Sequence, residues 1–149
     1  PFSPPSSVLF FLLFSLPLIF SPLYSSAASA VYKWQLFLQT LVYFSSSIQT
    51  AFQLDYHAHR FADTPEDEPS AQRRGHRRLR ETWKIIDDQI GDNEWILGDR
   101  LSAADIYLFM LTTWLETSRG HPPIHEFPNV QRIADAVMLR PSVQLVYGN

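Results

Sequence analysis

The sequence predicts an all-α fold, a bundle of four to five helices, and three observations lead to this prediction. Apolar residues recur every three or four positions over much of the chain, which is the period of one helical face. Proline, glycine and short polar clusters separate these periodic segments at positions typical of helix ends. No run of useful length shows the two-residue alternation of a half-buried strand, so we expect no sheet.

The composition fits one folded domain and excludes several classes of site. The chain has 149 residues, of which 46% are hydrophobic, and this is enough apolar material for a core. It has no cysteine, which excludes disulfides, thiolate metal ligands and a cysteine nucleophile. The net charge of −3 does not favour nucleic-acid binding.

Residues 1–30 differ from the rest because they are uncharged and rich in proline, serine and phenylalanine. Their apolar run, residues 8–20, is shorter than the roughly 20 residues that span a bilayer. Ala28-Ser29-Ala30 resembles the cleavage site of a secretory signal, but the chain begins Pro1-Phe2-Ser3, without methionine or a basic segment. We expect an incomplete or wrongly joined N-terminus outside the fold, with a secretory signal as the alternative, and a helical domain at residues 31–149.

The first helix is predicted at Val31–Asp55. Glutamine, serine and threonine are too frequent in it for a membrane span, so a buried helix of a soluble protein is expected. Its apolar positions step by three or four residues: Trp34, Phe37, Leu38, Leu41, Phe44, Ile48 and Phe52.

An acidic, proline-containing loop at residues 63–70 separates the first helix from the second, which is predicted at Ser70–Ile90. Gly91 follows at the position of a left-handed C-terminal cap. The inward positions of the second helix are Leu79, Trp83, Ile86 and Ile90. In the connector Asp92–Arg100, the apolar segment 95–97 is expected to pack back onto the helices.

The third helix begins after Ser102, the expected N-cap. Its hydroxyl can accept the Asp105 backbone N–H while the Asp105 carboxylate accepts the Ser102 N–H, which is a variant of the capping box. Leu101 and Ile106 stand at the positions of a hydrophobic staple. Residues 106–111 are apolar on every side, so we expect this helix to be enclosed by the others.

The fourth helix follows Pro128 and is expected to end near Leu139, because Pro141 disfavours the helical conformation of the residue before it. A last apolar turn is predicted at Val143–Tyr147. The inward positions of the fourth helix are Val130, Ile133, Ala134 and Val137.

Two pairs of histidines raise the question of a metal site. His57 and His59 stand two residues apart, and His121 and His125 four apart, but two prolines interrupt the second pair and no carboxylate motif completes a ligand set. We therefore expect no metal. The basic residues of segment 73–84 lie nearly all round the second helix, which indicates a solvated surface rather than a nucleic-acid site.

The segment Trp95-Ile96-Leu97-Gly98-Asp99-Arg100-Leu101-Ser102-Ala103-Ala104-Asp105-Ile106-Tyr107-Leu108 resembles the signature of the C-terminal domain of soluble glutathione S-transferases. Phe127-Pro128-Asn129-Val130 and Arg140-Pro141-Ser142-Val143 are similar to the end of that domain. The resemblance covers about residues 31–149 in the order of the elements.

The resemblance implies a helical bundle that packs against an N-terminal thioredoxin-like domain. In the family that domain binds glutathione and supplies the Ser, Tyr or Cys that activates its thiol, and residues 1–30 cannot build it. We therefore expect a fragment with no catalytic residue of its own, inactive alone. Its parent would be a cytoplasmic, homodimeric detoxification enzyme that conjugates glutathione, its co-substrate, to small electrophiles. The alternative is a standalone helical protein–protein interaction module, which would use an exposed apolar surface.

The resemblance to bacterial-type members also implies substrate-binding residues. Tyr107 and Trp114 match positions that face the electrophile pocket, and their spacing of seven would place both on one helical face. Tyr56 and His57, with His59, fall where family members contact substrate. The alternatives are core packing for the two aromatic residues of the third helix and ordinary loop positions for the others.

Overall fold

The computed structural model describes residues 27–148, with side chains from residue 31 onward. The predicted N-terminal segment 1–30, including the apolar run of the signal alternative, lies outside the described residues except for its last four. The chain divides into two units, residues 1–33 and 34–149. The packing described below concerns the second unit.

The regular elements of the described residues are helices, so the prediction of an all-α fold is confirmed. Within residues 27–148 there is no strand, only one bridge between Trp95 and Gly98. The helices are α2 (Ala27–Tyr43), α3 (Gln49–Tyr56), α4 (Glu68–Ile90), α5 (Ala103–Thr112), α6 (Pro128–Met138) and α7 (Pro141–Tyr147). A π-helical turn, Phe44–Ile48, joins α2 to α3, and short 3₁₀ turns occupy Ala58–Arg60, Pro65–Asp67, Thr117–Arg119 and Ile124–Glu126.

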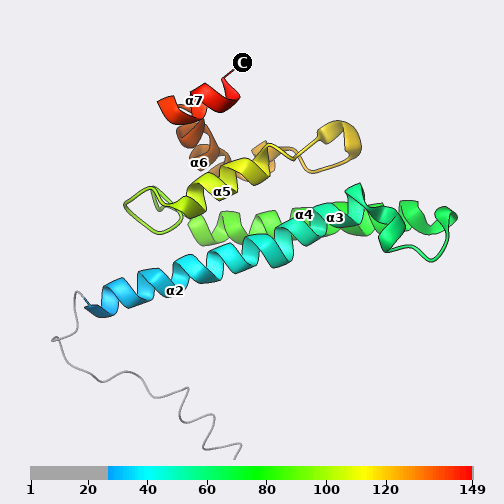
Figure 1. The fold of residues 1–149 in the computed structure, drawn as a ribbon, viewed down its shortest axis with the longest axis horizontal. Helices are drawn as coiled ribbons and strands as arrows, with labels where there is room; N and C mark the ends of the chain where they lie inside the picture. The colour runs from blue at the N-terminus through cyan, green and yellow to red at the C-terminus, as the bar shows by residue number, and fades with distance from the viewer. Residues whose placement is uncertain (1–26, 149) are drawn as a thin grey trace, which may run out of the picture. The chain divides into compact units, whose positions relative to one another are not determined.

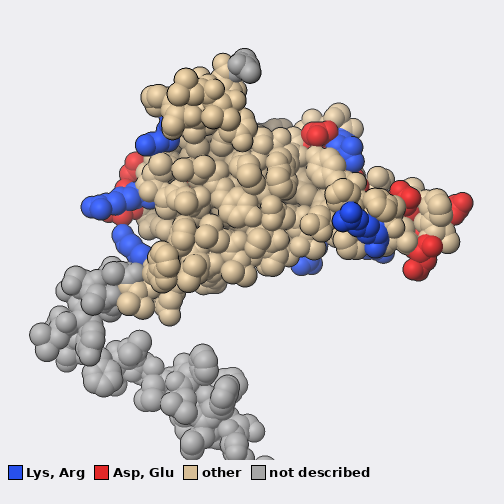
Figure 2. Space-filling view, viewed as in Figure 1, with Lys and Arg blue, Asp and Glu red and all other residues tan. Residues whose placement is uncertain are grey.

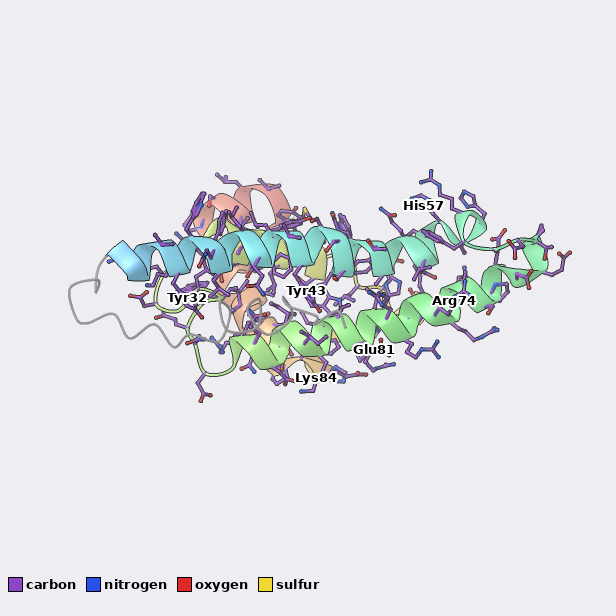
Figure 3. The ribbon with its side chains drawn as sticks, turned by 90° about the horizontal axis from the view of Figure 1, so that it is seen from below. Tyr32, Tyr43, His57, Arg74, Glu81 and Lys84 are labelled. Atoms are coloured by element: carbon purple, nitrogen blue, oxygen red, sulfur yellow. The ribbon has the colours of Figure 1, made fainter. Side chains whose placement is uncertain are left out.

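The helices pack in two groups that share one core. α3 runs antiparallel along α4, while α6 packs against both α4 and α5 and leads into α7 (Figure 1). Here α2, the π-helical turn and α3, residues 27–56, are together called the first helical rod. Figure 3 shows α4 alongside this rod, and the Tyr43 hydroxyl donates to the Thr82 carbonyl oxygen of α4 at 2.9 Å. The largest fully buried side chains are Trp83, Phe44, Phe52 and Phe127.

The predicted inward faces of the second and fourth helices are confirmed. All four predicted positions are buried in α4, and so are all four in α6. In the connector, Ile96 is buried, and Trp95 and Leu97 pack partly buried against the core as expected.

The predicted face of the first helix is wrong at its N-terminal end. Trp34 and Leu38 are 61% and 45% exposed, whereas Phe44, Ile48 and Phe52 are buried. The π-helical turn contains one residue more than an α-helical turn, and one residue corresponds to about 100° of rotation. It therefore rotates the buried face of α3 relative to that of α2. Positions of α2 that an uninterrupted α-helix would place on the same face as Phe52 face solvent instead.

Two other expectations about burial also need correction. α5 is not enclosed on every side, because Ile106 is 47% exposed. The apolar turn at the C-terminal end forms α7, but its side chains Leu145 and Val146 are exposed. Among the described residues, none of the helices combines the length and the apolar character that crossing a bilayer requires.

Candidate functional site

A cleft of about 430 Å³ opens between the C-terminal half of the first helical rod and the segment that follows α5. Aromatic side chains line part of its wall and polar side chains the rest, so the cleft offers both ring surfaces and hydrogen-bonding groups to a small molecule. The lining residues are Gln49, Phe52, Gln53, Tyr56, His57, Thr113, Trp114 and Glu116.

Three of the four residues predicted to bind substrate lie in this cleft, namely Tyr56, His57 and Trp114. Tyr107 is not among the lining residues, and its ring packs edge-on against Phe44 at 5.4 Å between centroids. The expected shared helical face does not form, because α5 ends at Thr112 before it reaches Trp114. His59 also lies outside the cleft lining.

Tyr56 connects the two walls of the cleft. Its hydroxyl lies 3.0 Å from the Trp114 carbonyl oxygen and 3.1 Å from Glu116 Oε1, and it has one hydrogen to donate to these two acceptors. The Arg119 guanidinium stands 4.5 Å from the centre of the Tyr56 ring, in cation–π geometry. Burial, followed by the hydrogen bond to Glu116, raises the pKa of Tyr56, so the phenol remains a donor at neutral pH.

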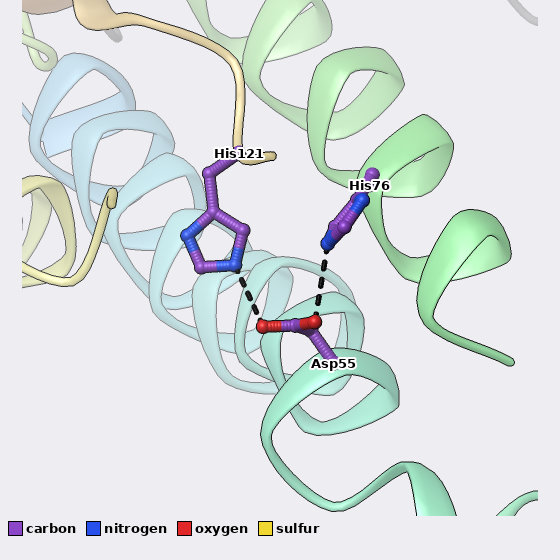
Figure 4. A group of neighbouring side chains, drawn as sticks. All are labelled: Asp55, His76 and His121. Carbon is purple, nitrogen blue, oxygen red and sulfur yellow. Dashed lines mark hydrogen bonds and ion pairs between the residues drawn. The ribbon is translucent and has the colours of Figure 1, made fainter. Parts of the chain in front are cut away.

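A cluster of charged and polar side chains, here called the Asp55 network, is centred on Asp55, and Figure 4 shows Asp55 with His76 and His121. It consists of Asp55 from α3, His76 from α4, and Arg119 and His121 from the segment after α5. Asp55 Oδ1 lies 3.1 Å from His76 Nε2, and Oδ2 lies 3.0 Å from His121 Nε2 and 2.9 Å from Arg119 Nε.

The Asp55 carboxylate is ionised in spite of its burial. It is 3% exposed, and desolvation by itself raises the pKa. The hydrogen bonds from Arg119, His121 and His76 together outweigh desolvation, so the pKa of Asp55 lies below its ordinary value.

Two glycines allow the network to form. A Cβ atom at Gly75 would lie 3.0 Å from Leu54 Cβ and 3.2 Å from the Ala51 carbonyl oxygen, so glycine permits the close approach of α3 and α4. Gly120 has a φ of +94°, and a Cβ atom there would lie 2.9 Å from His76 Cε1. The segment after α5 can therefore pass directly over the His76 ring.

The histidine pairs that raised the question of a metal site are not the groups that meet. Instead, one donor atom each of Asp55, His76 and His121 lie within 4.8 Å of one another. This donor set does not fit a metal ion, because His121 Nδ1 already accepts the Glu116 N–H at 3.0 Å and its Nε2 bonds to Asp55. Arg119 also places a positive charge on the carboxylate that a cation would need.

The basic residues of α4 project into solvent, as predicted. Arg80 pairs with the Glu126 carboxylate through Nε at 2.8 Å and through Nη2 at 3.2 Å. Arg74 donates to the Phe61 carbonyl oxygen at 3.1 Å. These arginines therefore stabilise neighbouring loops.

Residues 69–136 match the family model for the glutathione S-transferase C-terminal domain. Over these residues the chain is similar to that domain family. No curated protein sequence matches the chain.

Solved structures of glutathione transferases share the fold of this domain. One is a glutathione transferase homolog from Sulfitobacter with bound glutathione, with a TM-score of 0.70 and 19% identity over 78% of this chain and 55% of that one. Another is BphK, a bacterial glutathione S-transferase in a ternary complex, with a TM-score of 0.61 and 24% identity over 75% of this chain and 51% of that one. The chain thus spans about half the length of these structures.

Sequence reasoning missed the Asp55 network and the contribution of Glu116 and the two glutamines to the cleft. One signal was present: Asp55 is the first acidic residue of the chain, and it stands near the end of a helix between Leu54 and Tyr56. A charged residue on such a helix is expected to have partners. Those partners come from other segments, which the sequence pattern does not reveal.

Proposed function

We propose that this chain is the substrate-pocket half of a glutathione transferase and that its cleft holds a small electrophile. The observation that carries the proposal is that Tyr56, His57 and Trp114, from two separate segments, line one cleft. Aromatic rings suit a flat, conjugated electrophile, and the glutamines and Tyr56 can bond its polar substituents.

In this proposal glutathione is the co-substrate, and a thioredoxin-like domain of the parent chain holds it beside the cleft. Such an enzyme gains rate by lowering the pKa of the thiol and by placing the thiolate next to the electrophile. The cleft contributes only to the placement of the electrophile next to the thiolate, and not to the lower pKa of the thiol. The parent would act as a homodimer in cytoplasmic detoxification.

Electrophile binding is testable with the purified chain. We expect saturable quenching of tryptophan fluorescence by chlorodinitrobenzene, and loss of most of that quenching in Trp114→Phe. Trp34→Phe is the matched control, because Trp34 is exposed on α2 outside the cleft. Equal quenching in wild type and Trp114→Phe would show that this cleft is not the binding site.

Conjugation is tested separately. With glutathione and chlorodinitrobenzene, the purified chain should give only the uncatalysed rate, and a parent that includes the thioredoxin-like domain should turn over. Measurable turnover by the chain alone would contradict the assignment of thiol activation to another domain.

A second candidate function, the standalone interaction module, is favoured by an exposed apolar row on α2. Trp34, Leu38 and Val42 follow one another at four-residue spacing and are all exposed. Figure 2 shows a face whose charged side chains gather toward its ends, with an uncharged surface between them.

The intact mass of the protein from its native source separates the two candidates. A mass well above 17.2 kDa would favour the transferase, and a mass at or below that value would favour the module.

A further inference from the structure

We propose that Asp55 is a positioning residue for the cleft, which it shapes by fixing the tautomer of His121. In this arrangement His121 holds the Trp114–Glu116 wall in place. The inference rests on the proposed function, because it concerns the cleft that would bind the electrophile.

The hydrogen bonds of His121 define its tautomer. Its side chain is fully buried, and Nδ1 lies 3.0 Å from the Glu116 backbone nitrogen. A backbone N–H can only donate, so Nδ1 must carry a lone pair. Nε2 faces the Asp55 carboxylate, which can only accept, so Nε2 carries the proton.

The same histidine holds the segment after α5 at two points. Its own backbone N–H donates to the Glu116 carbonyl oxygen at 3.3 Å, while its ring accepts the Glu116 N–H. Glu116 lines the cleft, and the Tyr56 hydroxyl bonds both Glu116 and the Trp114 carbonyl oxygen. The position of this wall therefore depends on the His121 ring.

The opposite wall rests on the same ring. The His121 ring packs edge-on against Phe52 at 5.4 Å and against Tyr56 at 5.6 Å between centroids. Both of these aromatic residues line the cleft. A change in the orientation of His121 would therefore move both walls.

Asp55 can impose the tautomer because its own position is fixed. His76 of α4 binds one carboxylate oxygen, and Arg119 binds the oxygen that also receives His121. Gly75 brings α4 close enough for the first of these contacts. The Asp55 carboxylate that accepts from His121 is therefore fixed by its place on α3, by α4 and by the segment after α5.

Two substitutions separate the effect of the acceptor from that of the charge. Asp55→Leu removes the acceptor at similar volume. Asp55→Asn keeps a carbonyl oxygen, which we expect to face the two donors Arg119 and His121. The NH₂ group of its side-chain amide would then face His76. Asp63→Leu is the control, since Asp63 is an exposed acid beyond the first helical rod.

The first experiment is nitrogen-15 NMR of the histidine rings in the purified full chain. We expect His121 in the wild type to be neutral, with the proton on Nε2, and to remain so in Asp55→Asn and Asp63→Leu. Asp55→Leu should lose this tautomer and shift the Glu116 amide resonance. A wild-type His121 with its proton on Nδ1, or with both nitrogens protonated, would overturn the proposal even if Asp55→Leu does not fold.

The second experiment is binding of chlorodinitrobenzene to the same variants. Loss of a hydrogen bond to a charged partner predicts about tenfold weaker binding in Asp55→Leu and no more than about a twofold change in Asp55→Asn. Unchanged affinity in a folded Asp55→Leu would overturn the positioning role. Absence of binding by wild type would instead refute the proposed function, and the NMR result would still decide the tautomer.

Discussion

Three aspartates are buried among the described residues, and each binds groups from a distant segment or a neighbouring loop. Asp55 binds His76, Arg119 and His121, while Asp87 and Asp105 bind backbone N–H groups. A buried carboxylate is stable only when such partners replace the water it loses. Individual polar residues therefore connect the helices. Their hydrogen bonds fix the relative positions of the helices more specifically than apolar packing alone would.

Asp55 should make stability depend on pH in the acidic range. Its pKa is lower in the folded chain than in the unfolded chain, so the unfolded chain binds the proton more readily. Its contribution to stability is therefore complete above the unfolded pKa, about 3.9, and is lost as pH falls through the folded pKa.

Urea unfolding from about pH 7 to about pH 3 should show a smaller decline in Asp55→Asn than in the wild type. Asp63→Asn, at an exposed acid, is the control. Parallel curves for Asp55→Asn and the wild type would show that Asp55 does not contribute this pH dependence.

Asp105 should matter more than its partner Ser102. The Asp105 carboxylate accepts the Ser102 N–H at 2.7 Å and the Ser102 hydroxyl at 2.8 Å, and also the Ile96 N–H of the connector at 2.9 Å. Ser102 Oγ in turn accepts the Ala104 N–H at 3.2 Å, which completes the capping at the start of α5.

We expect Ser102→Ala to cost about 1 kcal/mol, the usual value of an N-cap. Asp105→Ala should cost about 2 to 4 kcal/mol, because it also leaves the buried Ile96 N–H unpaired. A double-mutant cycle by urea unfolding should be non-additive. Strictly additive losses would contradict the coupling of the two side chains.

At the scale of elements, the start of α6 is stabilised by another helix. Its N-cap residue, Phe127, offers no side-chain cap. Asp87 of α4 takes that role, since its Oδ1 accepts the backbone N–H groups of Asn129 at 2.8 Å and Val130 at 2.9 Å. A carboxylate at a helix N-terminus also interacts favourably with the helix dipole.

Asp87→Ala should therefore destabilise the chain by about 2 to 3 kcal/mol, because two backbone donors lose their acceptor. Amide exchange at Asn129 and Val130 should accelerate more than exchange elsewhere in α6. Asp88→Ala is the matched control, since Asp88 is exposed and pairs with Lys84 one helical turn away on α4. Equal effects of the two substitutions would exclude the capping role.

At the scale of the whole molecule, the core is built around Trp83. Its side chain is fully buried and stacks on Phe127 at 6.3 Å between ring centroids, which joins α4 to the start of α6. Within the described part of the chain its indole N–H has no hydrogen-bond partner. The ring thus contributes through burial and packing rather than through a polar contact.

Trp83→Ala should cost about 3 to 5 kcal/mol, the usual range for removal of a large buried aromatic residue. Trp83→Phe should cost clearly less, because it keeps most of the packing and removes an unpaired buried donor. Thermal unfolding of both variants measures the difference. An unchanged melting temperature in Trp83→Ala would place the residue outside the core.

The sequence by itself determined the helices, the inward faces of α4 and α6, and the start of α5 at Ser102. These features depend on periodicity and on hydrogen bonds between residues a few positions apart, so they are present in the local pattern. The sequence also placed Tyr56, His57 and Trp114 among the candidate site residues, on the resemblance to the glutathione S-transferase C-terminal domain.

Only the tertiary structure decided that these three residues share a cleft and that Tyr107 lies outside its lining. It also decided the rotation at the π-helical turn, the capping of α6 by Asp87 and the Asp55 network. The partners in these contacts are far apart in sequence: 42 residues separate Asp87 from Asn129, and 66 separate Asp55 from His121. Such contacts form only when packing of the apolar faces brings distant segments together, and no local pattern specifies which polar groups then meet.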